Sequence, residues 1–312
     1  MRLSSKIYIA GHTGMVGSAI VRDLKELGYT NIVVRTSAEL DLRNRKDVEE
    51  FFEKESPEFV FMAAAKVGGI VANNNLRAEF LYDNLAIAGN VIHAAHLFDV
   101  TKLLFLGSSC VYPKNSPQPI CEDQLLQGEL EKTNEPYAIA KIAGIKMCES
   151  YRSQYNSNFI SVMPCNLYGP NDNYNLETSH VLPALIRKFH EAKVNGDEYV
   201  SIWGTGNPKR EFLYVDDLAR ACVFLMESYN ELEPINVGCG KEISISELAI
   251  KIKDLVGFEG QVKYDHRKPD GTLRKVLDVT KLTEFGWSHS ISLDDGLKRT
   301  YKDFLSNIYN QQ

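Results

Sequence analysis

The chain has 312 residues, with 35 lysines and arginines against 41 aspartates and glutamates, for a formal net charge of −6. This length is enough for one large domain or two modest ones, each with a buried core. At 44% hydrophobic and 24% charged residues, the composition excludes a disordered or collagen-like chain. Basic residues are scattered among acids along the whole length, which argues against a nucleic-acid partner, and no apolar run approaches a membrane span.

The N-terminus and the cysteines indicate the compartment. The first residues lead into an apolar segment of about five residues, too short for a secretory signal, so we expect a cytoplasmic protein. The cysteines show no C-x-x-C pair, and no histidines stand at metal-ligand spacing. We therefore expect reduced thiols and no metal site. The cysteines are Cys110, Cys121, Cys148, Cys165, Cys222 and Cys239.

The first half of the chain alternates short apolar runs with amphipathic stretches, the pattern of a parallel sheet with crossover helices. The runs are close to continuously apolar, as strands covered on both faces should be. They fall at 6–10, 31–35, 59–63, 103–107 and 159–164. A long helix is predicted over 78–98, and a second begins near Pro136. The apolar stripe of the helix over 78–98 consists of Leu81, Leu85, Ala88, Ile92 and Ala95.

After Pro170 the sequence becomes polar over 171–175, as in a loop, and this marks a candidate domain boundary. Beyond it the chain is mixed, and we expect a smaller α/β cap over the first lobe. The strand candidates are 199–203, 235–238 and 261–264, and the helix candidates are 246–256 and 293–308.

A glycine-rich loop follows the first predicted strand. Gly11, Gly14 and Gly17 form G-x-x-G-x-x-G just before a predicted helix. Glycine is needed there where the turn is tight, where the backbone approaches a pyrophosphate and where helix packs on strand. The alternative is a plain packing loop. With the element order, the loop predicts an α/β, Rossmann-type doubly wound parallel sheet. We expect residues 1–170 to form the dinucleotide-binding domain, with some later segments returning to it, and 171–312 to be mainly a substrate domain.

The second predicted strand ends at Arg35, where an NAD-preferring site would carry an acid for the ribose hydroxyls. An arginine there suits the 2′-phosphate of NADP(H), although a solvated surface charge is the alternative. Asp41 and Leu42 follow at a position where adenine can lie. Ala63 and Ala64 end the third strand with side chains small enough for a ribose.

The fourth predicted strand delivers Gly107, Ser108 and Cys110 to the carboxyl edge of the sheet, where ligands bind in such folds. Tyr137 and Lys141 stand four residues apart on the next helix, so the ammonium should favour the phenolate and lower a pKa that starts at about 10. Such a tyrosine can exchange a proton with a carbonyl oxygen while hydride moves, and Ser108 would hold the same oxygen. A lone Tyr-x-x-x-Lys is a common accident, but this one has a glycine loop and a serine-bearing strand end before it.

These elements resemble the extended short-chain dehydrogenase/reductases that act on nucleotide sugars. The resemblance runs from about residue 6 to about residue 305, and its strings lie at 63–70, 107–113, 134–141, 166–170 and 210–212. These strings are similar to those of members that epimerise C3 and C5 of GDP-4-keto-6-deoxy-D-mannose and reduce C4 with NADPH, giving GDP-L-fucose. The resemblance implies that substrate, that cofactor and a homodimer. The helices at 78–98 and after Pro136 would pair two subunits, with Gly144 and Cys148 forming the close face.

The resemblance also implies that Cys110 and His180 are the acid and base of the epimerisations, without saying which is which. A cysteine serves as base only if a cation or helix dipole favours its thiolate, and Lys141 is the neighbour expected to help. The alternative for Cys110 is a small buried hydrophobe. For His180 we expect a helix start capped by Ser179, where imidazolium is disfavoured; the alternative is a surface histidine.

For the substrate diphosphate, the resemblance points to Lys188, Trp203 and Arg210, with Asp270 near the nucleotide end. Lys188 replaces an arginine and so loses the bidentate fork. A core position for Trp203 and an ion pair for Arg210 are the alternatives.

Cofactor contacts carried over from the resemblance span the loop, the strand ends and the later segments. They are Gly11, Thr13, Gly14, Met15, Val16, Gly17, Arg35, Asp41, Leu42, Ala63, Ala64, Gly107, Lys141, Pro164, Asn166, Leu167 and His180. Bacterial members carry arginines where this chain has Thr13 and Ser37. Arg35 is then the main candidate for binding a 2′-phosphate, and any preference for NADPH over NADH depends on it.

Three rival functions share this fold. A 4,6-dehydratase would need a carboxylate pair where Ser109 and Cys110 stand. An NAD-dependent 4-epimerase would usually have no thiol there and an acid at position 35, and it is the runner-up. A non-catalytic dinucleotide sensor would have no use for Tyr137 or Lys141.

Overall fold

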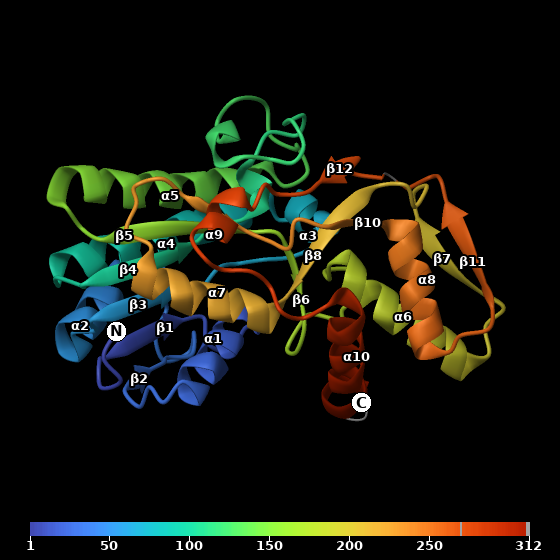
Figure 1. Cartoon of the computed structure of the whole chain (residues 1–312), viewed down its shortest axis with the longest axis horizontal. Coiled ribbons are helices and arrows are strands. Elements are labelled where there is room, and N and C mark those ends of the chain that lie inside the picture. The colour runs from blue at the N-terminus through green and yellow to red at the C-terminus, as the bar shows by residue number, and fades with distance from the viewer. Residues whose placement is uncertain (269, 310–312) are drawn as a thin grey trace.

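The computed structural model describes residues 1–268 and 270–309, which form two lobes joined side by side (Figure 1). The first lobe contains a six-stranded, all-parallel sheet in the order β2-β1-β3-β4-β5-β9. Its strands are β1 (Ile7–Ala10), β2 (Ile32–Val33), β3 (Phe59–Met62), β4 (Lys102–Leu106), β5 (Phe159–Pro164) and β9 (Ile235–Val237). The order reverses between β1 and β3, so the predicted Rossmann-type sheet is confirmed.

Helices cover both faces of this sheet, and the long ones pack in pairs. On one face lie α2 (Arg45–Glu55), α4 (Arg77–Leu97) and α5 (Glu135–Tyr155), with α4 and α5 in extensive contact. On the other face α1 (Met15–Glu26) packs along α7 (Val215–Ser228), a helix without a counterpart among the predicted elements. The buried strands are almost fully apolar, which supplies the main hydrophobic core.

The apolar stripe predicted on α4 is correct for Ala88 and Ile92, which are buried, but wrong for Leu85, which is 38% exposed. The first turns of α4 instead bury Phe80 and Asn84. The reason is a polar clamp, because Asn84 bonds both the N–H and the carbonyl of Lys66 and so fixes which side faces inward.

The dimer face expected at Gly144 and Cys148 is also wrong. A Cβ atom on Gly144 would lie 2.3 Å from the ring of Phe105, and Cys148 is buried. Both positions therefore face the sheet of their own chain.

The second lobe contains two small sheets. In the first, β8 (Lys209–Tyr214) pairs with β10 (Glu242–Ser244), β12 (Arg274–Lys275) and β6 (Asn166–Tyr168); in the second, β7 (Tyr199–Trp203) pairs with β11 (Gln261–Asp265). Their core is closed by α6 (Val181–Asn195), α8 (Ile245–Val256) and α10 (Leu293–Asp303). Shorter elements are α3 (Ile70–Asn75), α9 (Thr280–Glu284), the 3₁₀ turns η1 (Ser109–Val111) and η2 (Glu122–Gln124), and the π-helical η3 (Phe304–Tyr309).

Two expectations for the second half are wrong in detail. The sequence predicts that segment 235–238 belongs to the cap, but β9 pairs with β5 in the main sheet. The helix expected over 293–308 is α-helical only to Asp303, after which it widens into a π-helix. The predicted strand at 199–203 is correct.

Candidate active site

The glycine loop holds its shape because side chains do not fit at two of its positions. A Cβ atom on Gly11, whose φ is +85°, would lie 2.7 Å from the backbone nitrogen of Ala64; one on Gly17 would lie 2.1 Å from the carbonyl oxygen of Gly11. Gly14 starts α1 with no side-chain cap, and no acid stands in the first turn. The first N–H groups of α1, around Met15 and Val16, are therefore left to bind an anion, which fits the pyrophosphate of a dinucleotide.

Arg35 is bound by its own lobe. One guanidinium nitrogen lies 2.6 Å from Glu55 Oε1, the other donates to the carbonyl of Val34, and the group stands 5.5 Å from the ring centroid of Phe51. A cofactor 2′-phosphate at this strand end would compete with Glu55 for the guanidinium. The role predicted for Arg35 therefore depends on whether that pair opens.

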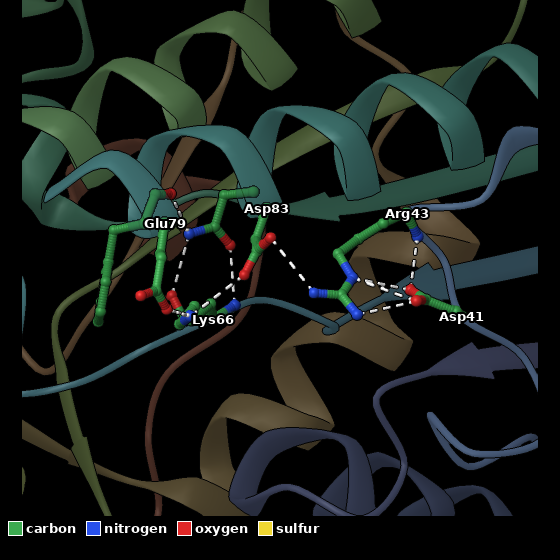
Figure 2. A network of polar contacts seen from close by, with 7 residues as sticks. Asp41, Arg43, Lys66, Glu79 and Asp83 are labelled. Atoms are coloured by element: carbon green, nitrogen blue, oxygen red, sulfur yellow. Dashed lines mark hydrogen bonds and ion pairs between the residues drawn. The ribbon is translucent and has the colours of Figure 1, made fainter. Parts of the chain in front are cut away.

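A chain of alternating charges crosses the region expected to meet adenine (Figure 2). Arg43 lies between Asp41, whose Oδ2 is 2.8 Å from Nη2, and Asp83, whose Oδ1 is 3.4 Å from Nη1. Lys66 pairs with Asp83 at 3.2 Å and also with Glu79. Hydrogen bonds from Arg43 lower the pKa of Asp41. The network connects the loops after β2 and β3 to α4. Asp41, which is predicted to contact the cofactor, forms an ion pair with Arg43 within the protein.

The loop after β3 also touches the segment that leads to α6. The N–H of Gly69 donates to the carbonyl of Thr178 at 2.6 Å, and a Cβ atom on Gly69 would lie 2.4 Å from the carbonyl oxygen of Ser179. Gly68 lies between Thr178 and Phe80, whose ring centroid is 6.5 Å from that of Tyr137. The segment before His180 therefore stands on the same side of the molecule as Tyr137.

The remaining predicted cofactor residues lie at the carboxyl ends of the central strands. Gly107 follows β4 in close contact with the carbonyl of Val162. Pro164 ends β5, and Leu167 lies in β6. The side chain of Asn166 donates to the carbonyl of Glu211 at 2.9 Å, so it fixes β6 to β8.

Ser108, Tyr137 and Lys141 meet at the end of β4. Ser108 caps η1 by accepting the N–H of Cys110, and its hydrogen bond lowers the pKa of Tyr137. Burial has the larger effect and raises that pKa. The ammonium of Lys141 donates to the carbonyl of Leu106 at 2.7 Å and lies 5.8 Å from the ring centroid of Tyr137; burial lowers its pKa to about 8.

The expectation that Lys141 makes Tyr137 a phenolate is therefore wrong for this state of the site. Burial raises the pKa of Tyr137, and the ammonium of Lys141 is held by the carbonyl of Leu106 at the end of β4. Tyr137 keeps its proton at neutral pH, which suits a donor to a carbonyl oxygen that is being reduced.

Cys110 is half-buried, and its sulfur lies 3.7 Å from the ammonium of Lys275. The cation beside the thiol is therefore Lys275. The expectation that Lys141 fills this place is wrong. Charge on Cys110 also affects the pKa values of Tyr137 and Arg210, which places both groups within its electrostatic reach. These polar contacts contradict the alternative of a buried hydrophobe. Sequence reasoning missed Lys275, which stands 165 residues away from Cys110 in the chain and belongs to no recognisable motif.

His180 occupies the N-cap position of α6 but makes no capping bond. The residue is exposed as a whole, and desolvation of the imidazolium by the surrounding protein lowers its pKa. The predicted cap by Ser179 is wrong, since the Ser179 hydroxyl is buried with no hydrogen-bond partner in the described part of the chain. His180 is thus neutral at pH 7 unless a bound ligand supplies a counter-charge.

Trp203 is 44% exposed, so a core role for it is wrong. Two ammonium groups flank its ring, that of Lys188 at 5.6 Å and that of Lys268 at 5.1 Å from the centroid. Lys188 also donates to the carbonyl of Ser201, and burial lowers its pKa. An exposed ring between cations suits an anion with an attached flat or apolar group. Lys268 is the second site residue that sequence reasoning missed.

Arg210 makes no ion pair with a carboxylate within residues 1–268 and 270–309, so that alternative is wrong; its Nη1 donates to the carbonyl of Lys209. Burial lowers its pKa, and Cys110 and Asp270 oppose that shift. Asp270 accepts the N–H and hydroxyl of Thr205 at 2.6 and 2.9 Å and so holds the turn after Trp203. Asp270 therefore links the turn after Trp203 to Arg210, and these cationic side chains suit an anionic ligand.

Glu211 is a further residue that the motifs did not single out. Its carboxylate is fully buried and accepts the N–H groups of Gly240 at 2.6 Å and Leu277 at 2.9 Å. Burial raises its pKa, and these backbone donors oppose that. It joins β8, the loop after β9 and the segment after β12, so it fixes the wall on which Arg210 and Lys275 stand.

Comparison with known proteins gives the class. The model of the NAD dependent epimerase/dehydratase family matches residues 7–238, and the chain belongs to this family. Within the described residues no helix is long and apolar enough to cross a membrane, and no group of potential ligands that could hold a metal ion is found.

Individual relatives narrow the class. The chain is 60% identical to GDP-L-fucose synthase 1 of Arabidopsis thaliana over 308 residues, 99% of this chain and 95% of that protein. It is 55% identical to GDP-L-fucose synthase of Escherichia coli K12, covering 97% of each. A solved GDP-mannoheptose C4 reductase from Campylobacter jejuni with NADP bound superposes with a TM-score of 0.91 at 41% identity, covering 98% of this chain and 100% of that one.

Proposed function

We propose that the protein converts GDP-4-keto-6-deoxy-D-mannose to GDP-L-fucose by epimerising C3 and C5 and then reducing C4. The observation that carries the proposal is the end of β4, where one segment presents Ser108 to Tyr137 and Cys110 to Lys275. Reduction needs the first pair, and epimerisation needs a thiol that can lose its proton. The full-length similarity to GDP-L-fucose synthases supports the same reaction.

The chemistry follows from a ketone at C4. It acidifies the hydrogens on C3 and C5, so one group of donors around its oxygen serves both epimerisations and the reduction. Ser108 and Tyr137 hold that oxygen. Cys110 and His180 act on opposite faces of the ring, one removing a proton from carbon and the other returning one. Bound NADPH supplies the hydride to C4, and Tyr137 gives its proton to the oxygen.

NADP(H) is the cofactor of this proposal. The uncapped start of α1 and the close fit of Gly11 against Ala64 support dinucleotide binding. Preference for NADPH over NADH depends on Arg35 leaving Glu55 for the 2′-phosphate, because Thr13 and Ser37 carry no charge.

The proposal includes a homodimer that works in the cytoplasm. Its face consists of exposed apolar side chains on α4 and the neighbouring α5: Tyr82 at 70%, Leu85 at 38% and Ile139 at 43% exposure. Residues 1–170 with returning segments bind the cofactor, and 171–312 mainly bind the GDP-sugar. Size-exclusion chromatography with light scattering tests the dimer, and a monomer at micromolar concentration would contradict it.

The test of the activity uses purified protein with GDP-4-keto-6-deoxy-D-mannose and either NADPH or NADH. Nicotinamide absorbance reports the hydride transfer, and NMR identifies the sugar. Oxidation of NADPH with a product inverted at C3 and C5 is expected. No oxidation with either cofactor would overturn the proposal, and interconversion of C4 epimers with bound NAD would establish the 4-epimerase instead.

A further inference from the structure

Lys275 is an isolated cation in a charge-rich part of the second lobe. Its neighbours Arg274 and Lys209 both pair with Glu242, at 2.6 and 3.3 Å. Lys275 forms no such pair within residues 1–268 and 270–309, and its side-chain contact is with Cys110 Sγ at 3.7 Å. A half-buried ammonium without a carboxylate is poorly compensated, so a negative charge on the sulfur would be stabilised there.

The backbone around Lys275 is fixed on both sides. Lys275 stands opposite Arg210 in the parallel pairing of β12 with β8. The next two N–H groups are held by side chains, that of Val276 by Gln118 at 3.0 Å and that of Leu277 by Glu211 at 2.9 Å. The backbone from which the Lys275 side chain extends is therefore held in place, and this keeps its ammonium within reach of Cys110.

Other groups also face the thiol. Tyr137 approaches from α5, Arg210 from β8, and Ser108 bonds the N–H of Cys110. Tyr137 is neutral at pH 7, while Asp270 lies near Arg210 and offsets part of its charge. Lys275 is then the cation in direct contact with the sulfur.

We propose that Lys275 is a positioning residue for epimerisation, holding Cys110 Sγ against the sugar and stabilising its thiolate. This inference rests on the proposed function. If Cys110 is the base, a C–H bond breaks, its electron pair moves to the C4 oxygen held by Ser108 and Tyr137, and the proton passes to sulfur. If it is the acid, the S–H proton passes to carbon and the thiolate remains beside Lys275. In both directions the charge on sulfur changes while the ammonium stays in place.

The first experiment measures the rate at which iodoacetamide alkylates Cys110 across pH, by mass spectrometry of its peptide in the full-length protein without substrate. Lys275→Met is expected to slow alkylation at neutral pH by about tenfold and to move the profile to higher pH. Lys275→Arg is expected to restore most of the rate. The exposed Cys121 is the internal reference, and Arg274→Met, one residue earlier on the same strand, is the matched control with an unchanged profile.

The second experiment measures exchange of the C3 and C5 hydrogens with deuterated water, together with reduction. In Lys275→Met the kcat for exchange is expected to fall by about tenfold or more with KM within about twofold. A raised KM with an unchanged alkylation profile would overturn the inference and assign Lys275 to the diphosphate. Alkylation needs no substrate. If Lys275→Met shows the expected shift of the alkylation profile but the wild-type protein is inactive on the GDP-sugar, the proposed function is refuted and the contact of Lys275 with Cys110 is not.

Discussion

The two lobes hold their site residues in different ways. In the first lobe Ser108 and Tyr137 are placed by backbone geometry, at the end of β4 and in the first turn of α5. In the second lobe Trp203 and Lys275 stand on short strands whose ends are held by two carboxylates, Asp270 and Glu211. We therefore expect the first arrangement to depend less on individual side chains than the second, which relies on Asp270 and Glu211.

Tyr137→Phe gives the largest expected effect and tests the first lobe alone. Reduction of C4 should fall by about 10²- to 10⁴-fold, because the proton donor is lost while the fold is kept. Exchange at C3 and C5 should fall less, since Ser108 still holds the oxygen. Nicotinamide oxidation and deuterium exchange measure the two steps, with Cys110→Ser as the converse variant, which should mainly block exchange. Equal losses of both steps in Tyr137→Phe would contradict this division of labour.

Glu211→Gln tests the support of the second lobe. An amide group would direct N–H donors at the N–H of Gly240 or Leu277, leaving buried donors unpaired at a cost of about 2–3 kcal/mol in the free energy of unfolding. Urea denaturation measures it. The exposed Glu247→Gln, in the capping box of α8, is the control with a smaller loss. A loss no greater than that of Glu247→Gln would show that the carboxylate is dispensable.

Gly204→Ala tests the turn beside Trp203. Gly204 has φ +75°, and a Cβ atom would lie 2.1 Å from Asp270 Oδ1, so the carboxylate that accepts from Thr205 has to move. We expect a KM for the GDP-sugar raised by about tenfold and a loss of about 2 kcal/mol in stability. Gly196→Ala is a matched control, with φ +71° but no atom within 4 Å of the added carbon. If both variants lose the same stability and neither changes KM, backbone strain alone accounts for the loss.

Asp172→Asn is the one change expected to stabilise the protein, and it concerns the loop between the lobes. Burial raises the pKa of Asp172 to about 7, so the folded state binds a proton that the unfolded state releases near pH 4. Stability from this group is present below pH 4 and is lost as the pH rises through 7. The variant should therefore be more stable than the wild type at pH 8, where the buried carboxylate is charged, and unchanged at pH 4. Equal stability at pH 8 by urea denaturation would show that the carboxylate is solvated.

Much of the first lobe could be predicted from the sequence. Strand ends and helix periodicity are local signals, and the end of a parallel strand is where ligands bind, so Ser108 and Tyr137 follow from the chain itself. Their electrostatics did not follow, because the pKa of Tyr137 depends on burial, and Lys141 bonds to the carbonyl of Leu106.

The second lobe was predicted as separate strands and helices, without their assembly. The partner of Cys110 is 165 residues away in the chain. The structural role of Glu211 depends on the packing of β8 against the segment after β12, which the sequence does not show. The misassigned segment at 235–238 has the same cause, since an apolar run does not reveal which of two sheets it joins.

The path of the chain has a consequence for protein engineering. After β5 it enters the second lobe through β6 to β8, returns through α7 and β9 and leaves again for β10 to β12. It touches the first lobe once more at α9 before α10 and η3. The second lobe is therefore not one continuous segment, and it cannot be exchanged as a single block of sequence. We expect changes of substrate specificity to be easier to engineer by replacing surface loops than by exchanging a whole lobe.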